Sequence, residues 1–380
     1  MAYATIMEGA ATARVPRAAK VSKEMEVFYN PVMRLNRDIT VLLLKTLGEA
    51  RKKERQREGE VFGGFSVGSP LAGTGIRECR LLVELEKGLI KELSMNDYSK
   101  DAVTLIKKNI SLNEQNLACH EIEVSCDEAN KFLLDSCGFS YIDLDPFGTP
   151  NPFLDAAIKR LQRGGVLAVT ATDTSALAGT YPDACRRKYW AEPMRNHLMH
   201  EVGLRILCRK VQLVGSQYEK ALIPLFSYAK DHYMRIFFLN ERRKKATDAI
   251  LRKHQYLHYC SRCLAVSVDK STMKVCCGAP TLVAGPLWTG LLWDERLAAA
   301  MTRTNRTWEH GRPENQRFLD TIAAEARAPE GLVGFYHLNL VKKTLGKTPL
   351  RKEELLARNG VYPTHLEGNA VRALSVRLLF

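Results

Sequence analysis

The sequence predicts an α/β fold in which a mostly parallel sheet ends in an antiparallel hairpin, followed by a smaller, mainly helical region. Three observations lead to this prediction. Strand-like and helix-like segments alternate between residues 62 and 172, which is typical of a parallel sheet covered on both faces. Two strand-like runs, 221–228 and 232–239, are joined only by residues 229–231, as in an antiparallel hairpin. After residue 245 the composition changes and cysteines cluster.

The composition indicates a globular protein with a polyanionic partner. The chain has 380 residues, of which 46% are hydrophobic, so a wholly disordered chain is excluded. Lys and Arg exceed Asp and Glu by 56 to 42, and the resulting net charge of +14 favours nucleic acid as the partner. No run of about 18 apolar residues is present, so we expect no membrane-spanning helix and no membrane partner.

The first twenty residues bear on localisation. They are rich in Ala and Arg, as in a transit peptide, but they lack the continuous apolar core of a secretory signal. We therefore expect a cytoplasmic protein, with no evident obligate protein partner. In that setting the ten cysteines are interpreted as reduced thiols or metal ligands and not as disulfides.

Each element follows from its local pattern. Ile39, Leu42 and Leu43 recur at helical spacing within a helix over 36–47, and the charged run 51–60 is expected to be its solvent-exposed end and loop. Ser99 is a plausible N-cap for the helix over 99–113. The expected strands are 64–68, 90–95, 122–125, 139–144 and 165–172, and the other expected helices are 76–87, 128–135, 152–161 and 195–214.

Two domains are predicted. Residues 1–245 would hold the catalytic sheet and residues 246–380 a second domain with a Cys-rich segment at 260–277, and the basic run 241–245 would link them. A parallel sheet finished by an antiparallel hairpin is the pattern of S-adenosylmethionine-dependent methyltransferases. A NAD-binding Rossmann domain normally lacks that hairpin, and the chain lacks a full G-x-G-x-x-G, so an oxidoreductase is disfavoured.

Polar and small residues follow the first three strands. Gly73 lies in the turn 68–75, where small residues let a ligand approach the backbone. Asp97 follows the second strand and can accept hydrogen bonds from a ribose diol, while Asp127 follows the third strand, beside an expected adenine. Each feature alone is equally compatible with a structural turn or a helix cap. Together, at three successive strand ends, they favour nucleoside binding.

The sequence Asp145-Pro146-Phe147-Gly148 follows the fourth strand. It resembles the Asp/Asn-Pro-Pro-aromatic signature of enzymes that methylate exocyclic amino groups of bases. Such an amine is a poor nucleophile because its lone pair is delocalised, and a carboxylate that accepts its N–H bonds can aim the lone pair at a methyl group. Asp145 would do this, Pro146 would stiffen the loop and Phe147 would stack on the base. A plain turn with a buried Phe is the alternative.

These motifs together resemble the tRNA (guanine(26)-N2)-dimethyltransferase family, and most of all its shorter, prokaryote-type members. No single segment is specific, but the set is, and it covers most of the chain. The matching segments are Val27 to Pro31, Leu35 to Ile39, Gly73 to Arg77, Asn96-Asp97, Asp143 to Gly148, Val169 to Asp173, His200 to Gly203 and Gly285 to Trp288.

The resemblance implies a methyltransferase that uses S-adenosylmethionine to modify N2 of a guanine in tRNA, at position 26, once or twice. Asp145 matches the catalytic carboxylate, and Phe28 and Phe147 match aromatic residues of the guanine pocket. Ser69 stands where the family often has Asp, which removes one acidic acceptor near the methionine end of the donor. The positions that match the donor site are Arg37, Arg77, Asp97, Asp127, Glu128 and Ala129.

The cysteine cluster is a candidate zinc site. Cys260 and Cys263 form a C-x-x-C pair, and the adjacent Cys276 and Cys277 follow after twelve residues. Four thiolates suit tetrahedral zinc. Some family members carry two C-x-x-C pairs here, whereas this chain has Lys274 at one expected position, which Cys276 or His258 would replace. The alternative is a loop of reduced thiols.

The last hundred residues resemble the tRNA-binding extension of the family, with a winged-helix-like element over 336–360. Its basic side chains either contact RNA phosphates or form an ordinary solvated face. Two other functions stay open: methylation of another nucleobase amine, in DNA or ribosomal RNA, and a non-catalytic RNA-binding relative. The basic residues concerned are Lys342, Lys343, Lys347, Arg351 and Lys352.

Overall fold

The computed structural model describes residues 3–17, 27–119 and 121–380, and the chain divides into two compact units. One unit comprises Met1–Val169 and Ala300–Gln316, and the other comprises Thr170–Ala299 and Arg317–Phe380. This division by packing differs from the functional division at residue 245, which stays a prediction. Among the described residues, no helix combines the length and apolar character needed to cross a membrane.

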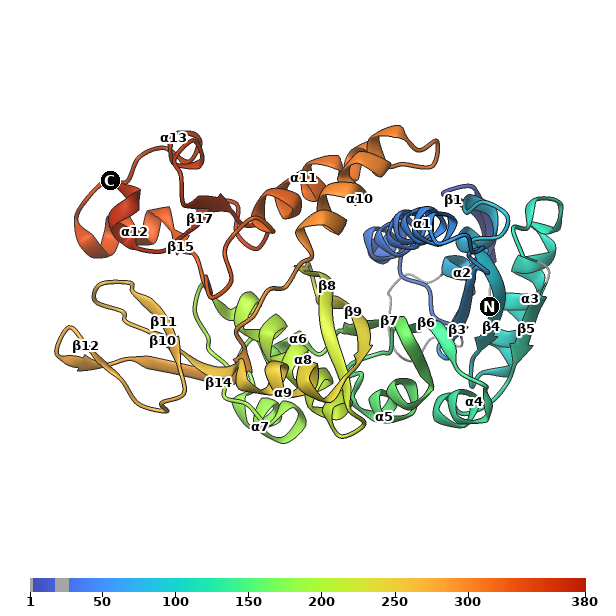
Figure 1. Cartoon of the computed structure of the whole chain (residues 1–380), viewed down its shortest axis with the longest axis horizontal. Helices are drawn as coiled ribbons and strands as arrows, with labels where there is room; N and C mark the ends of the chain where they lie inside the picture. Colours follow the sequence, from blue (N-terminus) through green and yellow to red (C-terminus); the bar gives the residue numbers. More distant parts are fainter. Residues whose placement is uncertain (1–2, 18–26, 120) are drawn as a thin grey trace. The chain divides into compact units, whose positions relative to one another are not determined.

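The main sheet has seven strands in the order β5-β4-β3-β6-β7-β9-β8 (Figure 1). The first five pair in parallel, and β8 and β9 form an antiparallel pair, as the sequence predicts. The predicted fold class is therefore confirmed. The strands are β3 (Phe65–Ser69), β4 (Ile90–Asn96), β5 (Glu121–Ser125), β6 (Phe139–Leu144), β7 (Leu161–Ala171), β8 (Lys220–Lys230) and β9 (Tyr233–Arg242).

Helices of the first unit alternate with its strands. Strand β3 is buried along its whole length, which is why its sequence is continuously small or apolar. The Ser99 side chain caps α3 by accepting from the backbone N–H of Ala102, as predicted. The charged run after residue 51 continues α1 as an exposed helix end up to Arg57. The helices are α1 (Arg34–Arg57), α2 (Ile76–Glu84), α3 (Lys100–Ser111), α4 (Ala129–Asp135) and α5 (Asn151–Arg160).

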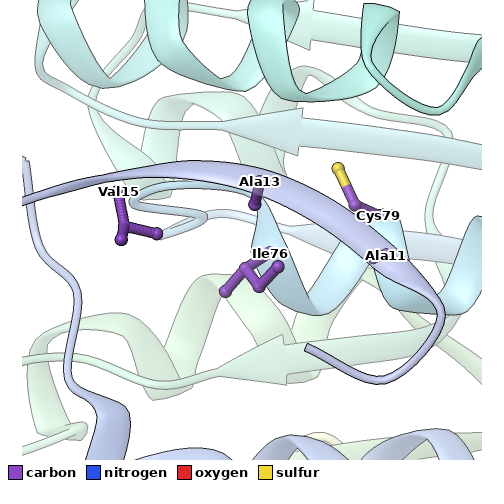
Figure 2. Close-up of a cluster of buried hydrophobic side chains, with 5 residues drawn as sticks. All are labelled: Ala11, Ala13, Val15, Ile76 and Cys79. Atoms are coloured by element: carbon purple, nitrogen blue, oxygen red, sulfur yellow. The ribbon is translucent and has the colours of Figure 1, made fainter. Parts of the chain in front are cut away.

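The Ala- and Arg-rich N-terminal segment forms a strand pair, β1 (Tyr3–Glu8) with β2 (Ala11–Pro16). Every second residue of β2 is buried against α2 in one apolar cluster (Figure 2). Asn109 of α3 and Asn113, just beyond that helix, accept hydrogen bonds from the backbone of β2 at 2.7 and 3.0 Å. The small side chains that make the composition of this segment resemble that of a transit peptide therefore have a structural role in the described strand β2, because they pack against α2. The cluster comprises Ala11, Ala13, Val15, Ile76 and Cys79.

The second unit contains helices and small antiparallel sheets. The run 241–245, expected to be a linker, instead forms the end of β9 and the start of α9, so that expectation is wrong. One sheet has the order β11-β10-β14, another β15-β17-β16, and β12 pairs with β13. The strands are β10 (His254–Tyr259), β11 (Val266–Asp269), β12 (Val275–Cys276), β13 (Ala279–Pro280), β14 (Leu282–Trp288), β15 (Tyr336–His337), β16 (Val361–Pro363) and β17 (Ala370–Ala373).

The remaining helices begin at Thr174, and after residue 245 they alternate with the small sheets, so the region expected to be mainly helical is a mixture of helices and strands. Two of them cross the boundaries of the units, because α10 begins before Ala300 and α11 begins at Gln316. The region 336–360, expected to be winged-helix-like, contains β15, α12 and α13, and the two strands that complete its sheet, β16 and β17, follow after residue 360. The helices are α6 (Thr174–Leu177), α7 (Pro182–Tyr189), α8 (Met199–Ser216), α9 (Lys244–Arg252), α10 (Glu295–Thr307), α11 (Gln316–Glu325), α12 (Leu338–Leu345) and α13 (Lys352–Leu356).

A buried ionic network holds the second unit together. Arg372 on β17 donates to Glu325 on α11 at 2.6 Å and to Glu201 on α8 at 2.9 Å. His365 lies 2.6 Å from the second oxygen of Glu325. Burial by itself raises the pKa of Glu325, but His365 and Arg372 together lower that pKa to about 2. The network thus joins three segments that are distant in sequence.

Candidate active site

The ends of three neighbouring strands are tied together by one asparagine. Asn96, at the end of β4, is fully buried and donates to the carbonyls of Pro70 at 3.1 Å and Asp127 at 2.9 Å. Its side-chain oxygen accepts from the backbone N–H of Asp127 at 2.9 Å. The loops after β3 and β5 are thereby fixed to β4. Sequence reasoning noted Asn96 only as a neighbour of Asp97.

The loop after β3 forms the tight turn that its small residues predict. Gly73 has φ +56°, and a Cβ atom there would lie 3.2 Å from the carbonyl oxygen of Phe28. The backbone N–H of Gly73 donates to the carboxylate of Asp97 at 2.9 Å, and Asp97 also accepts from Ser99 at 3.0 Å. Burial raises the pKa of Asp97, while these N–H groups oppose the increase. Asp97 therefore supports the loop directly.

A buried arginine joins two carboxylates at the end of β6. The guanidinium of Arg77, in the first turn of α2, pairs through one nitrogen with Asp143 and through the other with Asp145. The second oxygen of Asp143 accepts from Tyr141 at 2.7 Å. Burial alone lowers the pKa of Arg77, but the two aspartates raise it well above its usual value. Arg77 thus stays charged and orients Asp145.

These groups line a pocket in the first unit. Of the predicted site residues, the structure brings five to its wall: Phe28, Arg37, Gly73, Arg77 and Asp145. The guanidinium of Arg37 is bound by Glu8 of β1 through two contacts of 2.6 Å, and it donates to the carbonyl of Asn30. Glu8 was not identified from the sequence, because nothing local relates it to a residue 29 positions away.

The two predicted aromatic residues meet beside this pocket. The rings of Phe28 and Phe147 lie edge to face, with centroids 4.2 Å apart and planes at 71°. That contact leaves no space for a base between the two rings as they stand. Phe147 is 49% exposed, so its free surface is open to a ligand. Pro146 lies between Phe147 and the Arg77-bound Asp145 in the chain.

The predicted residues after β5 lie outside the set that lines this pocket. Asp127 pairs with Lys131 at 3.0 Å and is half exposed. Glu128 is the N-cap of α4, where its carboxylate accepts from the backbone N–H of Lys131, and Ala129 begins that helix. Asn96 links this strand end to the loop of Gly73, so the two parts belong to one edge of the sheet.

Two acidic residues of the pocket wall were not assigned from the sequence. Asp143 lies within the recognised motif, and a charged residue in an otherwise buried strand was the available signal. Glu78, on α2, is only 3% exposed and also lines the pocket. Burial raises the pKa of Glu78, and Arg77 and the Ser69 hydroxyl oppose that increase. Nothing in the sequence around Glu78 marked it as a site residue, because a glutamate in the first turn of a helix is common.

The four cysteines converge in the second unit. Their sulfur atoms all lie within 4.8 Å of one another, with Cys263 and Cys276 at 3.6 Å and Cys276 and Cys277 at 3.9 Å. In a tetrahedral site with zinc–sulfur bonds of about 2.3 Å, sulfur atoms are about 3.8 Å apart, so the donor set fits zinc. Cys277 has φ +52°, which turns the chain so that adjacent cysteines can face one centre.

The alternative ligand His258 is engaged elsewhere. Its two ring nitrogens lie 3.1 Å from the Thr281 hydroxyl and 3.0 Å from the carbonyl of Ser271. Lys274, at a position where a cysteine would complete the second pair, bonds to Ser267 and Asp269 instead. The structure therefore groups Cys276, and not His258, with the other thiols.

The C-terminal basic residues differ in their contacts. Lys342 and Lys343 are exposed in the last turn of α12, and Lys347 is exposed just after it. Arg351 instead pairs with Glu354 at 2.7 Å, and Lys352 donates to the carbonyl of Gly368 at 2.6 Å. Lys342, Lys343 and Lys347 are therefore the more accessible candidates for a polyanionic ligand, with the Lys347 ammonium 5.8 Å from the centre of the Phe380 ring.

Two curated relatives match this chain over most of its length. The chain is 39% identical to the tRNA (guanine(26)-N(2)/guanine(27)-N(2))-dimethyltransferase of Aquifex aeolicus, over 97% of this chain and 92% of that protein. It is 37% identical to the tRNA (guanine(26)-N(2))-dimethyltransferase of Methanothermobacter thermautotrophicus, over 91% of this chain and 88% of that protein.

A solved structure and a family model cover almost the whole chain. Trm1 from Pyrococcus horikoshii, solved with S-adenosyl-L-methionine, superposes with a TM-score of 0.81 at 29% identity, covering 97% of this chain and 96% of that one. The model of the family described as N2,N2-dimethylguanosine tRNA methyltransferase matches residues 9–373. With the Arg77-bound Asp145 in the pocket wall, these matches lead to one conclusion: the chain belongs to the N2,N2-dimethylguanosine tRNA methyltransferase family.

Proposed function

We propose that this protein transfers methyl groups from S-adenosylmethionine to the exocyclic N2 of a guanine in tRNA, at position 26. The observation that carries the proposal is the placement of Asp145. Its carboxylate lies in the pocket wall at the end of β6, held by Arg77 and followed directly in the chain by Pro146 and the exposed Phe147. The family to which the chain belongs supports the choice of donor and of nucleic acid.

Asp145 would act on the guanine amine. One carboxylate oxygen is held by Arg77, so the side chain is oriented before the substrate arrives. The other oxygen would accept an N–H bond of the amine, which draws the nitrogen lone pair out of conjugation and toward the methyl carbon. S-adenosylmethionine supplies a methyl group on a sulfonium. After transfer, the carboxylate can take the surplus proton, and a remaining N–H allows a second cycle.

The aromatic pair would bind the guanine ring. Because Phe28 and Phe147 contact each other at 4.2 Å, we place the guanine on the exposed face of Phe147 and not between the two rings. Stacking of a base on an aromatic side chain contributes about 1–3 kcal/mol. Phe28 would support Phe147 from its other side. The target guanine has to leave its own stack to reach this position.

The donor would occupy the pocket along the strand ends. Gly73 lets the ligand approach the backbone, and Asp97 and Asp127 would contact the ribose and the adenine from the ends of β4 and β5. Glu128 and Ala129 would complete this edge at the start of α4. Arg37 and Arg77 would flank the methionine end of the donor, with Glu8 and Asp145 as their protein partners.

Residues 246–380 would hold the tRNA. The exposed Lys342, Lys343 and Lys347 would contact phosphates, which position the RNA without reading its sequence. Such contacts make affinity fall steeply as the salt concentration rises. We place the activity in the cytoplasm, and we assign it to the single chain without an obligate protein partner.

A structural zinc ion would be held by Cys260, Cys263, Cys276 and Cys277. The spacing of their sulfur atoms supports this assignment. The cluster lies between β10 and β14 in the chain, where the local strands are short and bury little apolar surface. A metal would stabilise such a segment. With four cysteine ligands the zinc coordination would be complete, as in structural sites, whereas a catalytic zinc keeps one position open for water.

The direct test is nucleoside analysis by mass spectrometry. Unmodified tRNA would be incubated with the protein and a methyl-labelled donor, alongside the same tRNA with G26 replaced by A, a DNA duplex and ribosomal RNA. We expect label in N2-methylguanosine or N2,N2-dimethylguanosine, dependent on G26. Label only in DNA or ribosomal RNA would favour the rival methyltransferase, and donor binding without any transfer would favour a non-catalytic relative.

A further inference from the structure

One carboxylate in the pocket wall has no role in the scheme above. Glu78 lies in the first turn of α2, next to Arg77, and is 3% exposed. It lines the same pocket as Asp143 and Asp145. Among the described residues, its Oε2 atom makes no hydrogen bond. A buried carboxylate oxygen without a partner is unfavourable, so its presence in a ligand pocket points to a ligand that supplies the donor.

The protein itself offers Glu78 little compensation. Arg77 is adjacent in the chain, but its guanidinium nitrogens are already engaged by Asp143 and Asp145. Ser69 interacts with Glu78, yet the Ser69 hydroxyl reaches no partner with hydrogen-bond geometry. The wall around Glu78 therefore carries more carboxylate than guanidinium charge. An additional positive group would be favourable there.

The donor brings one positive group with N–H bonds, the α-ammonium of its methionine part. Three carboxylates line the pocket among the described residues: Glu78, Asp143 and Asp145. Asp143 is already bound by Arg77 and Tyr141, and Asp145 is assigned to the guanine amine. We infer that Glu78 receives the α-ammonium group of S-adenosylmethionine and so selects donors that carry it. This inference rests on the proposed function.

The position of Glu78 also explains a peculiarity of the first loop. β3 ends in Ser69, a neutral residue that cannot neutralise an ammonium group. Glu78 projects from the helix that follows this loop and interacts with Ser69. The acidic group for this end of the pocket is thus supplied by α2 and not by the strand.

The test compares two ligands in two proteins. Isothermal titration calorimetry would measure S-adenosylhomocysteine and its deaminated analogue, in which hydrogen replaces the α-ammonium, on the wild type and on Glu78→Gln. A hydrogen bond to a charged group predicts that Glu78→Gln weakens S-adenosylhomocysteine by about 10- to 100-fold. Binding of the deaminated analogue should change by less than about 2-fold. Glu121→Gln, an exposed residue on β5, is the matched control.

The outcomes separate the inference from the proposed function. Equal losses for both ligands, or no loss for either, in Glu78→Gln would overturn the role of Glu78 while the donor assignment stands. A wild type that binds neither ligand would overturn both. If thermal unfolding shows that Glu78→Gln does not fold, Glu78→Asp is the substitute, because it keeps the charge but shortens the side chain. The same selective loss of S-adenosylhomocysteine binding is then expected. Equal losses for the two ligands would again contradict the inference.

Discussion

Replacement of Arg77 by Met should destabilise the protein through the charges that it leaves behind. Arg77 is the shared partner of Asp143 and Asp145, whose side chains are only 3% and 16% exposed. The Met side chain fills a similar volume but cannot neutralise either carboxylate. Glu78 is also close enough to interact with Arg77, so three acidic groups would lose the same cation.

The expected magnitude follows from this burial. Removal of one partner from a buried ion pair costs about 3–5 kcal/mol, because the remaining charge is desolvated and uncompensated. The cost of leaving the carboxylate of Asp143 without its partner should reach this range, because that side chain is almost fully buried. The more exposed carboxylate of Asp145 should add less. Urea unfolding followed by circular dichroism should therefore show Arg77→Met less stable by about 3–5 kcal/mol. Arg163→Met, an exposed residue of β7, should change stability by less than about 0.5 kcal/mol.

A double variant tests the cause. In Arg77→Met with Asp143→Asn, one of the stranded charges is removed, so the loss should be smaller than in Arg77→Met alone. The coupling between the two positions should amount to about 0.5–3 kcal/mol. Strictly additive effects, or a loss in Arg77→Met no larger than in Arg163→Met, would refute the reasoning that Arg77 compensates buried carboxylates.

Three further predictions concern catalysis, metal and pH. Asp145→Asn should lower the methyl-transfer rate by about 10²- to 10⁴-fold in a labelled-donor assay, because the side chain can no longer take the proton, while donor affinity changes little. Cys276→Ser should lose zinc, measured by elemental analysis as about one ion per chain in the wild type. Burial raises the pKa of Glu325, but His365 and Arg372 lower it to about 2, below its ordinary 4.5. Its stabilisation is present above about pH 5 and is lost as the pH falls toward 2, so acid unfolding of Glu325→Gln should depend less on pH over that range.

Each of these has a control and a contrary result. Asp155→Asn, on the exposed side of α5, should retain full activity, and an active Asp145→Asn would remove the proposed mechanism. Cys126→Ser, an exposed cysteine outside the cluster, should keep its metal; zinc retained by Cys276→Ser, or absent from the wild type, contradicts the site. Parallel acid-unfolding curves for the wild type and Glu325→Gln would show that the network does not control acid stability.

Local patterns determined much of the catalytic sheet. The predicted strand 139–144 coincides with β6, and Ser99 caps α3 as expected. Such features depend on residues a few positions apart: continuous apolar runs produce buried strands, and a hydroxyl before a helix satisfies its first N–H groups. The places of Gly73, Asp97 and Asp145 at strand ends follow from the same patterns, because parallel strands end at one edge of the sheet.

Tertiary structure decided which charges meet. Arg77 joins Asp145 across 68 positions of sequence, and Arg37 joins Glu8 across 29. Neither pairing has a local signature, because a charged residue on a helix looks the same whether it faces solvent or a buried partner. The buried face of the N-terminal hairpin and the lack of a hydrogen bond to Oε2 of Glu78 among the described residues depend likewise on what packs against them. Sequence periodicity reports which face is buried, whereas the partner of a buried charge is set by the folding of distant segments onto one another.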